Sequence, residues 1–330
     1  MKFKIVAVIT ILSTILIAII GFIRNDTDFT VLATSYSESS TTLYNYNNKK
    51  VVDTNTFPIG SVENLIYDDK GHGIMYDNNG DQLVTIVDDE TKNYNINNNP
   101  SQLIKNDNGQ YMLHNGNLKF SISKYNEEYD KLVQSEKLPG FAQNFIIHND
   151  SIYVLTNVYD ENSNRKVTIY ALDINSLKVL NSIEVSGLTF GFYIREVDGD
   201  LKIYGNSNEE AKDLSIYTHQ LANKKTNLKV KSDIKVMWVS KVIDINEKEI
   251  ILNDFSIVSV DKNNVPKIEF KNDQTLIDLE YNKAEECYYL LAGDFDKNQF
   301  EVHKLNSNFD IIESSSLDLG HKKPTDLLLN

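Results

Sequence analysis

The chain has 330 residues, of which 41% are hydrophobic and 24% charged, so it holds enough apolar material for a packed core and is not a disordered polymer. Beyond residue 24, thirty basic residues face 47 acidic ones, a net charge of −17, and only two arginines remain, Arg165 and Arg195. Nucleic acid is therefore not an expected partner, because contacts to phosphates need clustered cations. The single cysteine, Cys287, cannot close an intramolecular disulfide, so stability must come from packing.

The N-terminal segment predicts a membrane anchor. Residues 5–23 form a stretch of 19 residues without a charge, preceded by Lys2 and Lys4. As a helix it would measure about 28 Å, close to the thickness of the hydrocarbon core. The lysines favour a cytoplasmic N-terminus, so the bulk of a single-pass cell-membrane protein would lie outside the cytoplasm. We expect a signal anchor over 1–24, a short linker over 25–28 and one domain over 29–330.

A cleaved secretory signal is the alternative for the same segment. Signal peptides have a shorter apolar region and small residues at the cleavage site, whereas Ala18 is followed by Ile19, Ile20, Gly21 and Phe22. The sequence therefore favours the uncleaved anchor, and the cleaved form remains open.

The rest of the chain predicts an all-β fold. Short runs alternate between apolar and polar residues, as at 118–122, 167–171, 214–217 and 300–304, and this period of two is typical of strands with one buried face. Turns rich in Asn, Asp, Gly and Lys separate these runs, as at 198–200. No helix-length segment beyond residue 28 shows clear helical periodicity.

A longer repeat predicts a ring of blades. Aliphatic strands begin near six positions that lie roughly 39 to 47 residues apart, which is the spacing of four-stranded propeller blades. The six starts are Ser61, Ser101, Phe141, Leu188, Lys235 and Gln274.

The C-terminal tail completes this pattern. Residues 29–54 supply three strands without a first strand, and 324–328 read like the blade start at 100–104. If the tail pairs with 29–32, a seven-bladed β-propeller closes with no open sheet edge. A pair of β-sandwiches or an eight-bladed ring are the alternatives.

With this period and closure, the chain resembles the seven-bladed propellers of bacterial surface proteins and YVTN-like or WD40-like repeat proteins over residues 29–330. The resemblance rests on the period, because no Gly-His to Trp-Asp repeat and no Tyr-Val-Thr-Asn motif is present. It therefore implies a fold and little chemistry.

The geometry of a propeller gives candidate ligand-binding residues. First strands line the central channel, and the residues just ahead of their aliphatic cores would face its mouth. Trp238 and Tyr193 could form an aromatic platform there, and Arg195 could anchor a carboxylate. The aligned residues are Glu63, Gln102, Gln143, Tyr193, Trp238, Thr275 and Asp326. The bland alternative is that they pack or plug the channel.

Signals for catalysis and metals are weak. The six histidines form no His-x-His or His-Glu-x-x-His pair, and we expect His219 and His303 on third strands. The run 294–298 is closer to a hairpin turn than to a calcium loop, because Gln299 stands where the glycine is needed. Cys287 lies in an apolar strand, where a thiol packs and is inert. We expect no catalytic residue, no metal and no cofactor.

The expected function is that of a membrane-anchored binding or scaffold propeller outside the cytoplasm. It would be a monomer that recognises a protein or a cell-wall glycan through loops on one disc face. The linker would enter on the face of the first-to-second strand turns, so the opposite face would look outward. The alternative is a metal-assisted hydrolase or lyase that acts on a sugar or lactone through channel carboxylates such as Glu63 and Asp326.

Overall fold

The structure, a computed structural model, describes residues 28–35, 37–62, 65–67, 73–77, 82–87, 90–96, 99–106, 108–159, 165–207 and 212–329. The predicted anchor over 1–24 and residues 25–27 of the linker lie outside this range. Among the described residues, no helix is long and apolar enough to cross a membrane.

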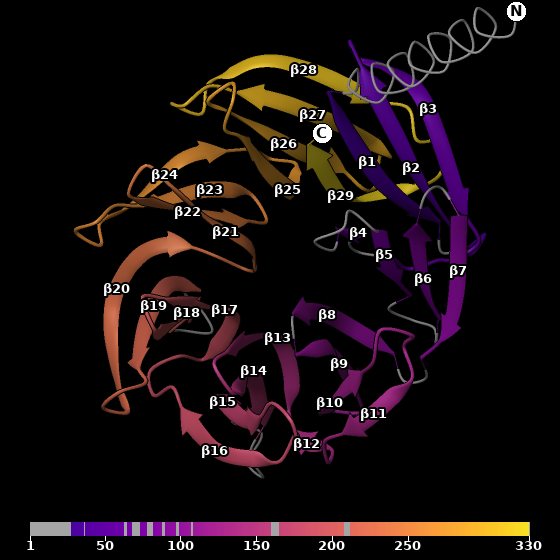
Figure 1. The fold of residues 1–330 in the computed structure, drawn as a ribbon. Coiled ribbons are helices and arrows are strands. Elements are labelled where there is room, and N and C mark those ends of the chain that lie inside the picture. Colours follow the sequence, from indigo (N-terminus) through magenta and orange to yellow (C-terminus); the bar gives the residue numbers. More distant parts are fainter. Residues whose placement is uncertain are drawn as a thin grey trace, which may run out of the picture.

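The described chain forms seven antiparallel sheets arranged as blades around an axis, coloured in sequence order in Figure 1. Blade 1 contains β29 (Lys323–Leu329), β1 (Phe29–Ser35), β2 (Ser40–Asn47) and β3 (Lys50–Phe57). Blade 2 contains β4 (Leu65–Tyr67), β5 (Gly73–Tyr76), β6 (Gln82–Val87) and β7 (Glu90–Asn95). Blade 3 contains β8 (Pro100–Asn106), β9 (Gly109–Gly116), β10 (Lys119–Tyr125), β11 (Lys131–Gln134) and β12 (Leu138–Pro139).

Blades 4 to 7 each contain four consecutive strands, and the first strand of every blade lies nearest the axis (Figure 1). They are β13 (Phe141–His148), β14 (Ser151–Tyr159), β15 (Arg165–Asp173) and β16 (Val179–Glu184); β17 (Phe190–Val197), β18 (Asp200–Asn206), β19 (Asp213–Gln220) and β20 (Lys225–Lys235); β21 (Val239–Ile245), β22 (Lys248–Asn253), β23 (Ser256–Val260) and β24 (Pro266–Lys271); and β25 (Thr275–Asn282), β26 (Cys287–Asp294), β27 (Gln299–Leu305) and β28 (Ile311–Leu317).

The predicted closure of the ring is confirmed. The C-terminal strand β29 pairs antiparallel with β1, and its register joins Val31 to Leu327 and Thr30 to Leu328. The tail thus supplies the innermost strand of blade 1. The prediction of seven blades is confirmed, and neither the sandwich pair nor the eight-bladed ring is formed.

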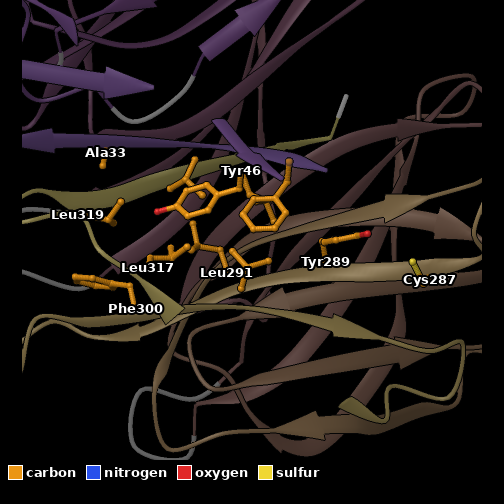
Figure 2. Packing of buried hydrophobic residues seen from close by; sticks show 12 residues of the cluster. Ala33, Tyr46, Cys287, Tyr289, Leu291, Phe300, Leu317 and Leu319 are labelled. Carbon is orange, nitrogen blue, oxygen red and sulfur yellow. The ribbon is translucent and has the colours of Figure 1, made fainter. Parts of the chain in front are cut away.

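The hydrophobic core is divided among the seven blade interfaces, with one buried cluster in each. Adjacent residues of one strand serve different interfaces, because side chains alternate across a strand. Val31 and Ala33 pack toward blade 7, whereas Leu32 packs toward blade 2. The interface of blades 7 and 1 is drawn in Figure 2, where Tyr46 lies among aliphatic and aromatic side chains.

The connections define two faces of the disc. The entry face carries the turns between first and second strands, and the chain enters β1 there, since Phe29 pairs with Leu329 at the end of β29. One such turn has positive φ at Asp198 (52°) and Gly199 (82°), the conformation of a tight hairpin between twisted strands. The distal face carries the second-to-third turns and the links between blades, such as 236–238.

Candidate functional site

A β-bulge near the start of the first strand sets which side chains meet the next blade. In six blades the pairing around this strand shifts by one residue at that place. The extra residue changes the face to which the residues ahead of it point. We call the residue after the shift the inner-ring residue. The six are Gln102, Asn144, Tyr193, Lys241, Asp278 and Asp326.

Two inner-ring amides hold neighbouring blades together. The Gln102 side chain accepts from the backbone N–H of Phe145 at 2.8 Å and donates to its carbonyl at 3.4 Å. Asn144 makes the same pair of bonds with Ile194, both at 3.0 Å. Each amide therefore satisfies backbone groups of the next first strand that its own ladder leaves unpaired.

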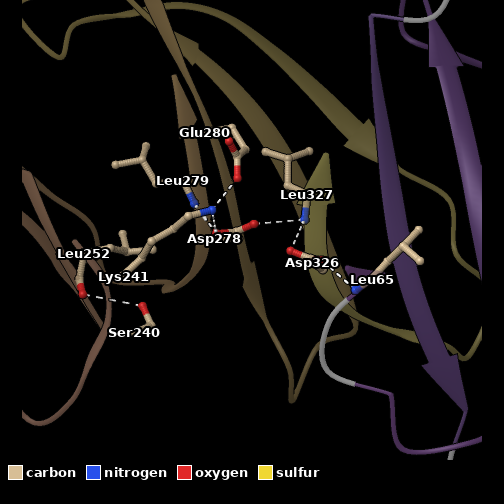
Figure 3. Close-up of polar contacts among 9 residues, drawn as sticks. All are labelled: Leu65, Ser240, Lys241, Leu252, Asp278, Leu279, Glu280, Asp326 and Leu327. Carbon is tan, nitrogen blue, oxygen red and sulfur yellow. Dashed lines mark hydrogen bonds and ion pairs between the residues drawn. The ribbon is translucent and has the colours of Figure 1, made fainter. Parts of the chain in front are cut away.

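At the closure of the ring, the inner-ring carboxyl groups likewise bind backbone N–H groups of neighbouring strands (Figure 3). Asp278 accepts from the N–H of Leu327 at 3.0 Å, which fixes β29 against blade 7. Asp326 accepts from the N–H of Leu65 at 3.0 Å, which fixes β29 against blade 2. Lys241 forms ion pairs with Asp278, at 2.9 Å, and with Glu280. Blades 6, 7, 1 and 2 are thus joined by one polar chain.

Burial governs the protonation of this cluster. Burial raises the pKa of Asp326 well above its usual range, and the neighbouring Asp278 carboxyl raises it further. Burial would lower the pKa of Lys241, but the charges of Asp278 and Glu280 outweigh it, so the ammonium group is retained. The ionised form of Asp326 is therefore disfavoured, while Asp278 lies in an ion pair with Lys241.

The structure places the residues singled out from the sequence at different positions. Gln102, Tyr193 and Asp326 are inner-ring residues, whereas Gln143 occupies the bulge position just before one. Trp238 and Thr275 each lie three residues ahead of an inner-ring residue, on the distal face. Glu63 lies outside the described residues. The six described positions therefore do not share one register along the first strands.

The aromatic platform has a different composition from the one expected. Trp238 packs on Phe192, with ring centroids 5.8 Å apart, and Phe192 in turn packs on Phe190 at 5.0 Å. Tyr193 instead packs edge-on against Tyr204. Phe192 therefore takes the place beside Trp238 that was expected for Tyr193. The bulge between Gly191 and Tyr193 is the reason, because it turns the Phe192 side chain toward blade 6.

Arg195 was predicted to anchor a carboxylate of a ligand, and in the structure it binds carboxylates of this chain. Its guanidinium binds Asp244 through two bonds, at 2.6 and 2.8 Å, and also binds Glu249, while its Nε donates to Tyr204 at 2.8 Å. Lys202 reaches the same Glu249 oxygen at 2.6 Å. Arg195 therefore ties blade 5 to blade 6 and is occupied.

A second set of asparagines lies on second strands, near the distal face. Asn115 accepts from the N–H of Ala142 at 3.0 Å and donates to its carbonyl at 2.9 Å. Asn157 binds Gly191 in the same way, at 2.9 and 3.0 Å. In blade 5 the corresponding residue is Asn206, which is 6% exposed and whose Oδ1 has no hydrogen-bond partner among the described residues. In the sequence each of these asparagines stands two residues after a large apolar residue, Leu113, Leu155 or Tyr204, and this spacing is the signal that could have found the position.

The surface beside Asn206 is hollowed. A hollow of about 360 Å³ is lined by Arg165, Phe190, Phe192, Asn206, Lys212 and Met237, which carry two positive charges and no carboxylate. A second hollow, of about 630 Å³, shares Met237 and extends over blade 6 past Phe255 and Ile268. We call the two together the distal groove.

The rim of the distal groove is apolar and exposed. Trp238 is 38% exposed, Phe255 40% and Met237 54%. The Arg165 guanidinium lies 4.7 Å from the Phe190 ring and donates to the Tyr159 hydroxyl. Aromatic rings, cations and a buried amide thus converge on one face. Exposed aromatic patches of this kind are typical of binding surfaces.

Other polar residues have internal partners. His219 and His303 lie on third strands as predicted, and each ring Nδ1 bonds a hydroxyl, of Thr226 and Ser314 respectively, at 2.8 Å. Asp294 accepts the N–H groups of two residues in its own turn. Burial raises the pKa of the Cys287 thiol to about 11. Within the described ranges, no group of three His, Cys, Asp or Glu side chains has the spacing of a metal site.

No protein-family model and no curated protein matches the chain. Many solved structures are similar to it. A quinonprotein alcohol dehydrogenase-like protein from Bacteroides thetaiotaomicron aligns over 92% of this chain and 78% of its own, with 14% identity and a TM-score of 0.64. The periplasmic gluconolactonase PpgL of Pseudomonas aeruginosa aligns over 91% and 98%, with 10% identity and a TM-score of 0.63. BamB from Moraxella catarrhalis aligns over 87% of each chain, with 12% identity and a TM-score of 0.52.

These similarities define the class of the molecule as a β-propeller. At such low identity they show the fold alone, and they agree with the resemblance inferred from the period of the sequence. Function has to be argued from the residues of this chain.

Proposed function

We propose that the chain is a membrane-anchored binding or scaffold propeller outside the cytoplasm, which recognises a protein or a cell-wall glycan through the distal groove. The observation that carries the proposal is the groove itself. It gathers Phe190 and Phe192, on which Trp238 packs, with Arg165 and Lys212 on a chain that is otherwise strongly acidic.

The position of the groove agrees with an N-terminal anchor. The chain enters blade 1 on the entry face, whereas the groove opens between second-to-third turns and interblade links on the distal face. An anchor over 5–23 would hold the entry face toward the bilayer and leave the groove accessible. The net charge of −17 beyond residue 24 would discourage contact with anionic headgroups.

Partner capture tests the binding role. Full-length protein in detergent micelles is incubated with the envelope fraction of its source cells, and Trp238→Ala and Asn93→Ala proteins are treated in parallel. Asn93 is the matched control, because it lines a separate hollow of about 590 Å³ on the same face, between blades 1 and 2. A partner retained by wild type and Asn93→Ala but lost by Trp238→Ala supports the proposal. Equal recovery by all three would contradict it.

Cell fractionation tests the proposed location. Carbonate-washed membranes should retain the protein, and protease added to intact cells should degrade the propeller. A protein released by carbonate, or protected in intact cells but degraded after lysis, would contradict it.

A metal-assisted hydrolase or lyase acting on a sugar or lactone is the second candidate. It is favoured by Asp326, a buried carboxyl whose pKa is raised by burial and by the neighbouring Asp278 carboxyl, as the pKa of a general acid often is. Against it, both carboxyls already accept backbone N–H groups of neighbouring blades. Calcium should leave the melting temperature of a binding propeller unchanged, whereas an increase that EDTA abolishes would favour the hydrolase.

A further inference from the structure

The asparagines of the second strands show what this position binds. Asn115 and Asn157 each use one side-chain amide to accept the N–H and donate to the C=O of a single residue in an extended strand. An amide side chain in this arrangement matches the hydrogen-bonding groups of one peptide residue. The position is therefore built to hold polypeptide backbone in the extended conformation.

Asn206 has the same chemistry without a bound strand. It lies opposite Phe190 in the ladder of β17 and β18, so it is fixed by the sheet. Its side chain lines the smaller hollow, and its Oδ1 is buried with no partner among the described residues. Buried amide oxygens are normally hydrogen-bonded, so this one calls for a donor from outside the ring. Either orientation of the amide presents one donor edge and one acceptor edge.

The surroundings of Asn206 indicate which side chains an extended segment bound there would have. Arg165 and Lys212 line the same hollow, and they favour acidic side chains there. The larger hollow offers Phe255, Ile268 and Met237 to apolar side chains, and the two lysines and two aspartates that also line it balance in charge. In an extended chain successive side chains point to opposite sides, so alternating acidic and apolar residues would meet both kinds of surface.

We propose that the distal groove binds an extended segment of a partner protein, with alternating acidic and apolar side chains, whose backbone is held by Asn206. This inference rests on the proposed binding function and narrows it to a protein ligand. A glycan would also stack on the partly exposed ring of Trp238, but it has no paired N–H and C=O groups along an extended backbone. The amide of Asn206 therefore favours the peptide.

Selection from a display library of twelve-residue peptides tests the inference. Full-length protein in detergent micelles is the target, and enriched peptides are remade with a fluorescent label for anisotropy titration. Wild type, Asn206→Ala, Arg165→Glu, Trp238→Ala and the control Asn93→Ala are compared. Polygalacturonate, an anionic glycan, is titrated alongside.

We expect enriched peptides to be rich in aspartate or glutamate and in apolar residues. Asn206→Ala and Arg165→Glu should each lower the affinity for these peptides by about tenfold or more, since the first removes hydrogen bonds and the second a charge pair. Asn93→Ala should bind within about twofold of wild type. Circular dichroism and the melting temperature confirm that the Asn206→Ala protein is folded.

Two results would overturn the inference. One is the absence of enriched peptides, and the other is enriched peptides that bind Asn206→Ala as tightly as wild type. If polygalacturonate then binds wild type but not Trp238→Ala, the binding function stands and only the peptide assignment falls. If neither probe binds, both proposals fall.

Discussion

The interface that closes the ring and the interface that bears the groove use side-chain-to-backbone hydrogen bonds differently. At blades 7, 1 and 2, Asp278 and Asp326 bind the N–H groups of Leu327 and Leu65, so the closing strand is fixed on both sides. At blades 5 and 6, the side-chain oxygen of Asn206 has no hydrogen-bond partner within the described part of the chain, and a groove opens there.

The comparison separates positions that hold the ring from a position that the ring does not use. Asn115 and Asn157 show that the asparagine site can stabilise the fold. Where one of these asparagines does not bind the next blade, its side-chain hydrogen-bonding groups become available to a ligand. A repeated motif in a propeller is therefore best examined copy by copy.

Loss of packing at the closing strand should have the largest effect. Leu327 is fully buried between blades 7 and 1, so Leu327→Ala should lower the free energy of unfolding by about 2–5 kcal/mol. Urea denaturation followed by circular dichroism measures it. Leu180→Ala is the control, because Leu180 is 59% exposed on an outer strand and should change stability by less than about 0.5 kcal/mol. Similar losses in both variants would mean that the closing strand does not hold the ring.

Removal of Arg195 should have a moderate effect on stability and none on the groove. Arg195→Ala leaves Glu249 and the Tyr204 hydroxyl without one partner each, at a cost of about 2–3 kcal/mol in the free energy of unfolding. Asp244→Ala should cost less than about 1 kcal/mol, because that side chain is 62% exposed. Thermal and urea denaturation give both values. A loss of peptide binding in folded Arg195→Ala protein would show that Arg195 acts in recognition after all.

The carboxyl of Asp326 should make stability depend on pH. Its pKa is raised in the folded state, so the folded protein holds more protons than the unfolded chain. The stability from Asp326 is complete below the unfolded pKa of about 4 and is lost as pH rises toward the folded value, at up to about 1.4 kcal/mol per pH unit.

Asp326→Asn removes this dependence while keeping an acceptor for Leu65. Relative to wild type, the variant should become more stable as the pH rises from 4 to 8, in urea titrations at each pH. Asp318→Asn, an exposed change of the same charge, should run parallel to wild type. A parallel course for Asp326→Asn would show that the carboxyl is ionised in the folded protein.

The ring could be predicted from the sequence, but the direction in which the first-strand side chains point could not. The period of the first strands and the likeness of 324–328 to 100–104 led to the closing strand that the structure contains. The inner-ring residue was missed by one position at Gln143 and by three at Trp238 and Thr275. Each first strand there has a bulge, and one extra residue breaks the alternation from which a face is inferred.

The groove was only partly visible in the sequence. Trp238 and the two arginines beyond residue 24 stand out in the sequence, and the asparagines at 115, 157 and 206 each lie two residues after a large apolar residue. Whether such an asparagine binds the next blade depends on its spatial distance from that strand, which no local pattern encodes. For this reason Asn206 could be distinguished from Asn157 only in three dimensions.

Asn157 holds the ring and Asn206 does not, and urea denaturation of the two alanine variants side by side distinguishes these roles. Asn157→Ala leaves the N–H and C=O of Gly191 unpaired and should lower the free energy of unfolding by about 2 kcal/mol. Asn206→Ala should leave that free energy within about 0.5 kcal/mol of wild type, because the Asn206 Oδ1 bonds none of the residues that the structure describes. Equal losses in the two variants would contradict the account.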